Sequence, residues 1–123
     1  MKPYSLLIVD DEERFANMLA MRLNLRGCDC EVCYNGQDAI DIIQEKSFDL
    51  VLLDLRLPDI YGTDVLAGIK EINAKIPVII VTAHGTEKDR QLCIQLGAYA
   101  FMHKPLNIEE LTPILEKLRE LSE

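Results

Sequence analysis

Short apolar runs alternate with amphipathic segments along the whole chain. Four runs of strand length are almost entirely apolar, as expected of parallel strands buried on both faces: residues 5–9, 50–54, 78–82 and 99–102. Residues 28–34 form a more polar run that fits an edge strand. Apolar residues recur at helical spacing in the segments that follow each run: about 12–26, 36–46, 63–73, 86–96 and from 107 onward. Strict alternation predicts an α/β fold of (βα)₅ type, with a five-stranded parallel sheet and helices on both faces.

The predicted helices carry recognisable apolar faces and boundaries. Gly27 and Gly97 are expected to stop the first and fourth helices, and Thr86 to cap the fourth. The fourth helix has the weakest apolar face, so we expect it to be the most mobile. Pro113 predicts either a kink in the last helix or a helix start near Thr112, and both options stay open. The residues expected on buried faces are Phe15, Met18, Leu19 and Leu23; Ala39, Ile40 and Ile43; Val65, Leu66, Ile69 and Ile72; Leu92 and Leu96; Leu111, Ile114 or Leu115, and Leu118.

Composition narrows the class of protein. The 123 residues fit one domain, 1–123, with no output domain in this chain. A formal net charge of -8 argues against a nucleic-acid-binding surface. No apolar run approaches the ~20 residues that span a bilayer, and the first residues do not resemble a signal peptide. We therefore expect a cytoplasmic protein that contacts neither nucleic acid nor membrane.

The four cysteines are expected to be reduced thiols that fill space. Cys28 and Cys30 should face one side of their strand and Cys33 the other, because side chains alternate along a strand. No further Cys or His lies nearby to complete a tetrahedral metal site. The alternative, a metal or redox role for this cluster, is therefore weaker.

Polar residues suited to phosphate chemistry follow four of the apolar runs. Asp10 and Asp11 follow the first, Asp54 ends the third, Thr82 ends the fourth and Lys104 comes shortly after the fifth. In open α/β sheets ligands bind beyond the carboxyl ends of the strands, so these side chains should share one crevice. Two carboxylates ~4 Å apart repel by about 4 kcal/mol at an effective dielectric of ~20, so the three acids call for a cation. All-oxygen ligation suits Mg²⁺.

A carboxylate in such a crevice can attack a phosphoryl group to give an acyl phosphate. Lys104 would supply a positive charge and Thr82 a hydrogen bond to the phosphoryl oxygens. No general base is needed, because a carboxylate is already ionised at pH 7. Taken singly, each residue has a structural alternative: Asp10 or Asp11, for example, could simply cap the helix that begins near Glu12.

The motifs at these strand ends resemble the receiver domain of two-component response regulators. The resemblance covers essentially the whole chain, and the stretch after Thr82 is most similar to receivers of enhancer-binding-type regulators. It is carried by residues 8–12 (Ile-Val-Asp-Asp-Glu), 54–59 (Asp-Leu-Arg-Leu-Pro-Asp) with Gly62, 82–85 (Thr-Ala-His-Gly), 97–99 (Gly-Ala-Tyr) and 104–105 (Lys-Pro).

The resemblance implies a flavodoxin-like fold with strand order 2-1-3-4-5. It implies that Asp54 is the phosphoacceptor, which takes its phosphate from a phosphohistidine on a sensor histidine kinase or a histidine phosphotransfer protein. It also implies a Mg²⁺ ion, or Mn²⁺ in its place, held by Asp10, Asp11, Asp54 and the backbone carbonyl of Arg56. Such a domain is not an enzyme acting on a separate substrate, although it can catalyse its own phosphorylation and slow dephosphorylation.

The resemblance further assigns the phosphoryl oxygens to Thr82, Lys104 and the amide of Ala83, and it implies a cis peptide between Lys104 and Pro105. Movement of Thr82 would let Phe101 turn inward and alter the surface of the fourth helix, fifth strand and fifth helix. That surface would serve an output domain or effector, or a phosphorylation-dependent homodimer. Many receivers have Tyr where this chain has Phe101, and an ordinary core ring is the alternative.

Two residues past Asp54 and Thr82 lie Arg56 and His84. In receivers these positions flank the site and influence phosphate lifetime, and both side chains can donate hydrogen bonds. The alternative is that they are solvated loop side chains. His103, beside Lys104, is expected to point elsewhere and is assigned no role.

Three other functions compete with a phosphorylated receiver. A nucleotide- or flavin-binding protein should have a Gly- or Ser/Thr-rich first loop, whereas residues 10–13 are all acidic. A Mg²⁺-dependent phosphohydrolase with an Asp nucleophile should have an acid where Arg56 stands. A degenerate receiver that serves only as an interaction module should lack part of the set of site residues.

Overall fold

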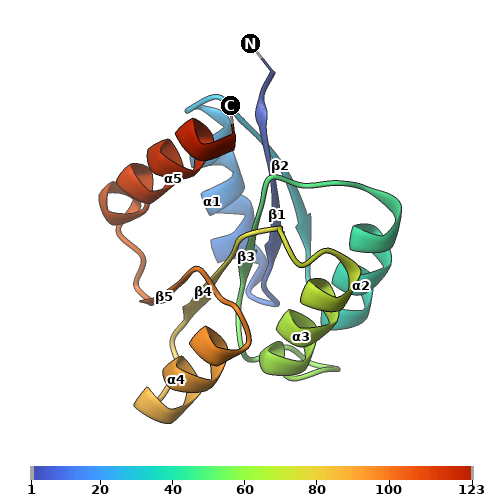
Figure 1. Cartoon of the computed structure of the whole chain (residues 1–123). Helices are drawn as coiled ribbons and strands as arrows, with labels where there is room; N and C mark the ends of the chain where they lie inside the picture. The colour runs from blue at the N-terminus through green and yellow to red at the C-terminus, as the bar shows by residue number, and fades with distance from the viewer. Residues whose placement is uncertain (1, 123) are drawn as a thin grey trace.

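The computed structural model describes residues 2–122, in which five strands alternate with five helices (Figure 1). The strands are β1 (Tyr4–Val9), β2 (Cys28–Cys33), β3 (Leu50–Leu53), β4 (Val78–Thr82) and β5 (Ala100–His103). The helices are α1 (Glu13–Asn24), α2 (Gly36–Glu45), α3 (Gly62–Ile72), α4 (Glu87–Gln95) and α5 (Ile108–Ser122). Every predicted element is present, and the predicted boundaries differ from these by a few residues.

All strand pairs are parallel, and the sheet order is β2-β1-β3-β4-β5. The fold is therefore the expected flavodoxin-like (βα)₅ arrangement. The apolar strands β1, β3 and β4 form its centre, and the more polar β2 is an edge strand, as predicted. Because Val9 pairs with Leu53, the residues that follow them emerge side by side from the sheet. This register places the ends of β1 and β3 together.

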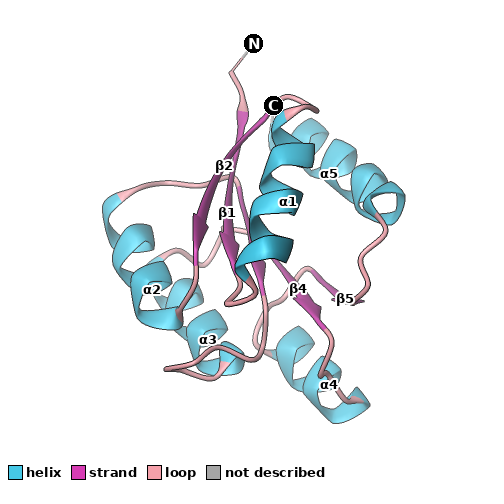
Figure 2. Ribbon diagram, turned by 180° about the vertical axis from the view of Figure 1, so that it is seen from behind, coloured by secondary structure: helices cyan, strands magenta, loops and turns pink. Residues whose placement is uncertain are grey.

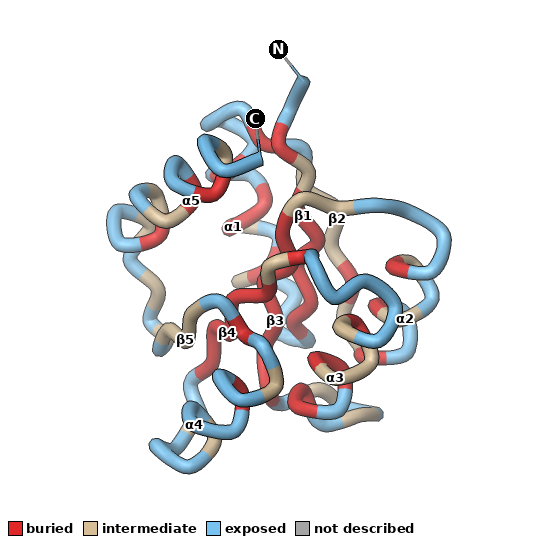
Figure 3. The backbone as a smooth tube through the Cα atoms, viewed as in Figure 1, coloured by how far each residue is buried: buried red, intermediate tan, exposed pale blue. Residues whose placement is uncertain are grey.

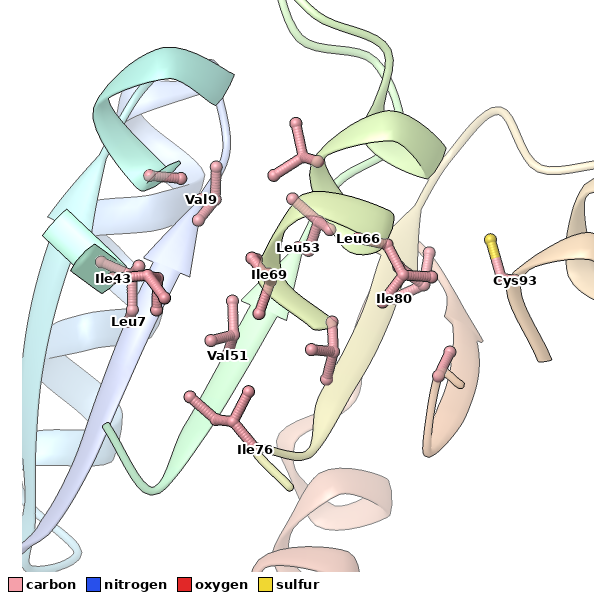
Figure 4. Close-up of a cluster of buried hydrophobic side chains, with 14 of the residues drawn as sticks. Leu7, Val9, Ile43, Val51, Leu53, Leu66, Ile69, Ile76, Ile80 and Cys93 are labelled. Atoms are coloured by element: carbon pink, nitrogen blue, oxygen red, sulfur yellow. The ribbon is translucent and has the colours of Figure 1, made fainter. Parts of the chain in front are cut away.

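Helices cover both faces of the sheet: α1 and α5 lie on one side, and α2, α3 and α4 on the other (Figures 1 and 2). Each face has its own apolar core, and the buried positions concentrate in the strands and on the inner sides of the helices (Figure 3). In the core beneath α2 and α3, side chains such as Val51 and Leu53 of β3 meet Leu66 and Ile69 of α3 (Figure 4). Two separate cores account for strands that are apolar on both sides.

The cysteines of β2 divide between the two cores as strand alternation requires. Cys28 joins the core of α1 and α5, Cys30 packs against it, and Cys33 joins the opposite core. All three are free thiols, and burial raises the pKa of Cys30 and Cys33 to about 12. The raised pKa values keep these thiols protonated at neutral pH, and the thiolate is the nucleophilic form of cysteine.

Two expected core positions are wrong. On α4 the fully buried residue is Cys93, whereas Leu92 is 42% exposed. The helix is short and buries a single residue. Its weak apolar pattern does not determine which side faces the sheet, and packing against the sheet decides this instead. On α3, Ile72 is 39% exposed because it occupies the final position of the helix, where the chain leaves the core.

The helix boundaries follow local chemistry. Gly27 and Gly97 adopt the left-handed region, with φ of 85° and 102°, and lie just beyond α1 and α4 as predicted. Thr86 caps α4 in a reciprocal capping box with Asp89. The described part of α5 runs from Ile108 through Pro113, so a start near Thr112 is wrong.

Two side-chain hydrogen bonds stabilise the first turns of α5. Asn107 accepts a hydrogen bond from the amide of Glu109 at 2.9 Å at the start of the helix. Further along, the Thr112 hydroxyl donates to the carbonyl of Ile108 at 2.8 Å, in the turn where Pro113 offers no amide donor. Within residues 2–122, no helix has the length and apolar character needed to cross a membrane.

Candidate functional site

Two buried carboxylates stand at the centre of the sheet edge. Asp10 follows β1 and Asp54 follows β3, and both are almost completely shielded from solvent. The amide of Asp54 donates to the carbonyl of Val9 at 2.9 Å, which extends the strand pairing into the site. The Asp10 carboxylate also accepts a hydrogen bond from the amide of Glu12 at 2.9 Å and so shapes the turn into α1. Strand pairing therefore holds the two acids together.

Lys104 reaches this edge from the segment that follows β5. Its ammonium nitrogen, Nζ, lies 2.8 Å from Asp10 Oδ2, 2.7 Å from Glu12 Oε1 and 3.2 Å from Asp54 Oδ2. The ring of Phe15 covers another side, with 4.5 Å from Nζ to the ring centre. The peptide from Lys104 to Pro105 is cis, as predicted. One cation thus contacts three carboxylates that come from two different loops.

Burial and charge shift the pKa values of the central pair. Burial raises the pKa of Asp10 to about 6, although the hydrogen bond from Lys104 opposes the shift. Burial alone would lower the pKa of Lys104, but hydrogen bonds to Asp10 and Glu12 raise it above its usual value. Lys104 is therefore a permanent positive charge at neutral pH.

The carboxylates of Asp10, Glu12 and Asp54 fit a divalent metal ion. One oxygen from each lies within 4.8 Å of the others. They are hard oxygen donors, and together with Lys104 they leave the cluster with net negative charge when ionised. Sequence reasoning missed Glu12, although the run of acids from Asp10 onward was the available signal. Asp11, which was expected among the ligands, is exposed and lies outside this group.

Thr82 and Phe101 both lie close to Gly85. Thr82 is fully buried at the end of β4, and its hydroxyl accepts a hydrogen bond from the amide of His84 at 3.2 Å. Phe101 on β5 is half-buried, and a Cβ placed on Gly85 would collide with the Phe101 ring and lie 3.0 Å from the Thr82 methyl carbon. The Phe101 and His103 rings pack edge to face, with their centres 5.4 Å apart. The loop after β4 therefore touches both residues expected to act as the switch.

The remaining expected residues surround the opening of the site. Arg56 and His84 are exposed in the loops after β3 and β4, and the Arg56 amide lies 3.4 Å from Asp54 Oδ1. Ala83 and Lys104 help to line a hollow of about 410 Å³ whose other walls include Phe15. The structure therefore gathers Asp10, Asp54, Thr82, Ala83 and Lys104 around one edge of the sheet.

Asp59 is a second residue that sequence reasoning left without a role. Its carboxylate accepts hydrogen bonds from the amides of Gly36 at 2.8 Å and Gln37 at 2.9 Å, at the start of α2. These bonds lower the pKa of Asp59. Gly62, at the far end of the same loop, donates to the carbonyl of Leu55 at 2.7 Å. These hydrogen bonds attach the loop after Asp54 to the start of α2 and join the end of the loop, at Gly62, to its beginning, at Leu55.

The fold and the site together define a class of protein. The strand order reverses between β1 and β3, which is where ligands bind in flavodoxin-like α/β domains. At this point the chain places two buried acids and a lysine. An acidic first loop separates it from the nucleotide- and flavin-binding members of that class, whose phosphate loops present bare amides.

Comparison with known proteins gives the family. Residues 6–116 match the response regulator receiver domain. Over 116 residues the chain is 35% identical to the transcriptional regulatory protein TrcR of Mycobacterium tuberculosis, and over 124 residues 37% identical to a putative NtrX-like response regulator of Rickettsia typhi. These alignments cover 94% and 99% of the chain, but only 45% and 26% of the relatives, so the chain spans less than half of either.

A solved structure agrees with this assignment. The receiver domain of a CheY-like protein from Methanospirillum hungatei superposes with a TM-score of 0.90 at 28% identity, covering 96% of this chain and 95% of the other. The chain therefore belongs to the response regulator receiver domain family of two-component systems. Its relatives include regulators of the enhancer-binding type, as the residues after Thr82 indicated.

Proposed function

We propose that this domain accepts a phosphoryl group on Asp54 and reports it through a change of surface. The observation that carries the proposal is the position of Lys104, whose ammonium lies 3.2 Å from Asp54 Oδ2 while both side chains are buried. A point charge there can neutralise a phosphoryl group on the same carboxylate. The family to which the chain belongs supports the same role.

In the proposed reaction a carboxylate oxygen of Asp54 forms a bond to phosphorus. The bond from phosphorus to the donor breaks, and its electron pair leaves with the donor: the imidazole nitrogen of a phosphohistidine, or the oxygen of a small acyl phosphate. The carboxylate needs no base, and the chain's task is to position it and stabilise the added charge. Lys104, the Thr82 hydroxyl and the Ala83 amide would bind the phosphoryl oxygens.

The oxygen ligands of a divalent metal ion would include Asp10, Asp54 and the carbonyl of Arg56, with Asp11 acting from the exposed side of the loop. Glu12 lies within the same acidic group, but its carboxylate contacts Lys104 at 2.7 Å and we do not assign it to the ion. Mg²⁺, or Mn²⁺, would supply charge neutralisation at the phosphoryl oxygens. The buried Asp10 and Asp54 support this proposal, because two neighbouring carboxylates gain from a divalent cation.

Output would pass from Thr82 to Phe101 and then to the surface of α4, β5 and α5. Gly85 supports this route because a Cβ at this position would meet both the Phe101 ring and the Thr82 methyl group, so the two side chains both lie close to one small residue. Leu92, Ile94 and Tyr99 are each more than a third exposed near α4 and β5, so this surface offers apolar area to a partner. The partner would be an output domain, a separate effector or a second copy of the chain.

The donor in a cell would be a sensor histidine kinase or a histidine phosphotransfer protein. We place the domain in the cytoplasm, as a single receiver unit over 1–123 that acts on its own aspartate. Arg56 and His84 would adjust phosphate lifetime from the mouth of the site. If the Arg56→Ala and His84→Ala double variant loses phosphate at the wild-type rate, these two side chains are only solvated loop residues.

Incubation with acetyl phosphate and Mg²⁺ tests the proposal directly. Intact-mass measurement should show one added phosphoryl group in the wild-type protein and none in Asp54→Asn. No gain in the wild type, or an equal gain in the variant, would refute phosphorylation of Asp54. Omission of Mg²⁺ should abolish the gain, and Mn²⁺ should restore it. Continuous rapid release of inorganic phosphate would favour the hydrolase alternative instead.

A further inference from the structure

Carboxylates surround the ammonium of Lys104 in this structure: it donates hydrogen bonds to Glu12 and Asp54 and forms an ion pair with Asp10. A lysine offers three donors, and three carboxylate oxygens lie within 3.2 Å of Nζ. The Phe15 ring covers a further side at 4.5 Å, and the lysine side chain is only 8% exposed. Before Lys104 can donate to a phosphoryl oxygen, it must release one of its present partners.

The three partners differ in the cost of release. Asp10 is buried, and a buried carboxylate that loses its cation is strongly destabilised. Asp54 is the residue that would carry the phosphoryl group, so it cannot move away. Glu12 is different because its side chain is 58% exposed and its carboxylate can return to water. Glu12 is therefore the partner that Lys104 can exchange.

Glu12 is also well placed for this exchange. It stands at the N-cap position of α1, and its amide is held by Asp10 at 2.9 Å, so its backbone is anchored while its side chain is free to turn. Its oxygen makes the shortest of the three contacts with Lys104, at 2.7 Å. An incoming phosphoryl oxygen would replace one anion by another beside the same ammonium.

We infer that Glu12 competes with the phosphoryl group for Lys104 and so slows phosphorylation of the resting domain. The inference rests on the proposed function and adds a regulatory contact to the same site. The inference predicts that phosphorylation becomes faster when Glu12 loses its charge. A simple metal-binding role for Glu12 predicts the reverse, because loss of a metal-binding carboxylate would weaken Mg²⁺ binding and slow the reaction.

Glu12→Gln tests the inference, because it keeps the size of the side chain and removes its charge. Glu13→Gln is the matched control: the neighbouring residue is also exposed, and it has no contact with Lys104 among those described. At saturating Mg²⁺, Glu12→Gln should accept phosphate from acetyl phosphate roughly two- to five-fold faster than both wild type and control, the range expected for one exposed ion pair. A rate equal to the control, or a slower one, would overturn the inference.

A second measurement does not depend on phosphoryl transfer. Beryllium trifluoride, a phosphoryl analogue, should bind Glu12→Gln more tightly by a similar factor. In wild-type protein labelled with ¹³C at glutamate side-chain carboxyls, its addition should shift the Glu12 signal and leave Glu13 unchanged. An unmoved Glu12 signal would contradict the exchange. If the wild type takes up neither acetyl phosphate nor the analogue, the proposed function itself fails, which is a distinct outcome.

Discussion

Gly62 is predicted to be irreplaceable because the loop that carries Asp54 closes directly against it. A Cβ at this position would lie 2.5 Å from the Cα of Leu55 and 2.6 Å from the carbonyl oxygen of Asp54, whereas ordinary contacts are 3.4–4 Å. Both obstructing atoms belong to the backbone, so no side-chain rotation can relieve the overlap. The substitution Gly62→Ala must push the loop away from α3.

The cost follows from the size of this overlap. Extra methylenes in a packed core cost about 1–3 kcal/mol when side chains can adjust, and rigid backbone places Gly62→Ala at the upper end, about 3 kcal/mol. Domains of this size are stable by about 5–15 kcal/mol, so the loss is a large fraction of the total. The melting temperature should fall by roughly 10 °C.

Urea unfolding followed by circular dichroism measures the effect, and Gly68→Ala is the control in the same helix. There the new Cβ would meet only the side chain of Ile40, at 2.9 Å from Cδ1 and 3.9 Å from Cγ1, and the closer atom is the end of a flexible side chain. Alanine is also favoured over glycine inside a helix by about 1 kcal/mol. Gly68→Ala should therefore stay within about 1 kcal/mol of wild type. If Gly62→Ala is equally well tolerated, the argument from backbone overlap is refuted.

Three further predictions concern other parts of the chain. Phe15→Leu removes the cation–π interaction between the ring and Lys104, which is worth about 0.5–1 kcal/mol. The variant should accept phosphate from acetyl phosphate roughly two- to five-fold more slowly. An unchanged rate would show that the ring does not position the ammonium. Burial raises the pKa of Tyr4 from 10.0 to about 12, so the unfolded chain loses this proton first and stability should fall as pH rises from 10 to 12. Tyr4→Phe should reduce that fall by about 1–3 kcal/mol in urea titrations across this range, and an identical pH profile would contradict it. Thr86→Ala removes the capping bonds of α4 and should cost about 1 kcal/mol by the same assay, whereas Thr86→Ser should retain most of them.

The fold and the centre of the site follow from patterns that are local in the sequence. Each apolar run identifies a strand, and parallel strands place their ends at one edge, which was enough to bring Asp10, Asp54 and Lys104 together. The identity of the third acid did not follow. Asp11 and Glu12 are adjacent acids, and the turn into α1, closed by the bond between Asp10 and the Glu12 amide, decides which of them reaches Lys104.

The errors arose where docking between elements decides the outcome. The weak apolar pattern of α4 pointed to Leu92 and Leu96 as its buried residues, whereas packing against the sheet buries the smaller Cys93. The structural role of Asp59 was missed for a related reason. A carboxylate after proline is common in loops, and its bonds to the start of α2 depend on how two loops meet in space.

Lys104 lies late in the chain, 92 positions after Glu12 and 50 after Asp54. During synthesis the strands that carry the two buried acids leave the ribosome before the lysine that neutralises them. A product that stopped after β4 would bring these carboxylates together without their counter-charge, and their repulsion would oppose folding. The last strand and the lysine that follows it thus complete the charge balance as well as the sheet, which disfavours stable copies of the domain that end before β5.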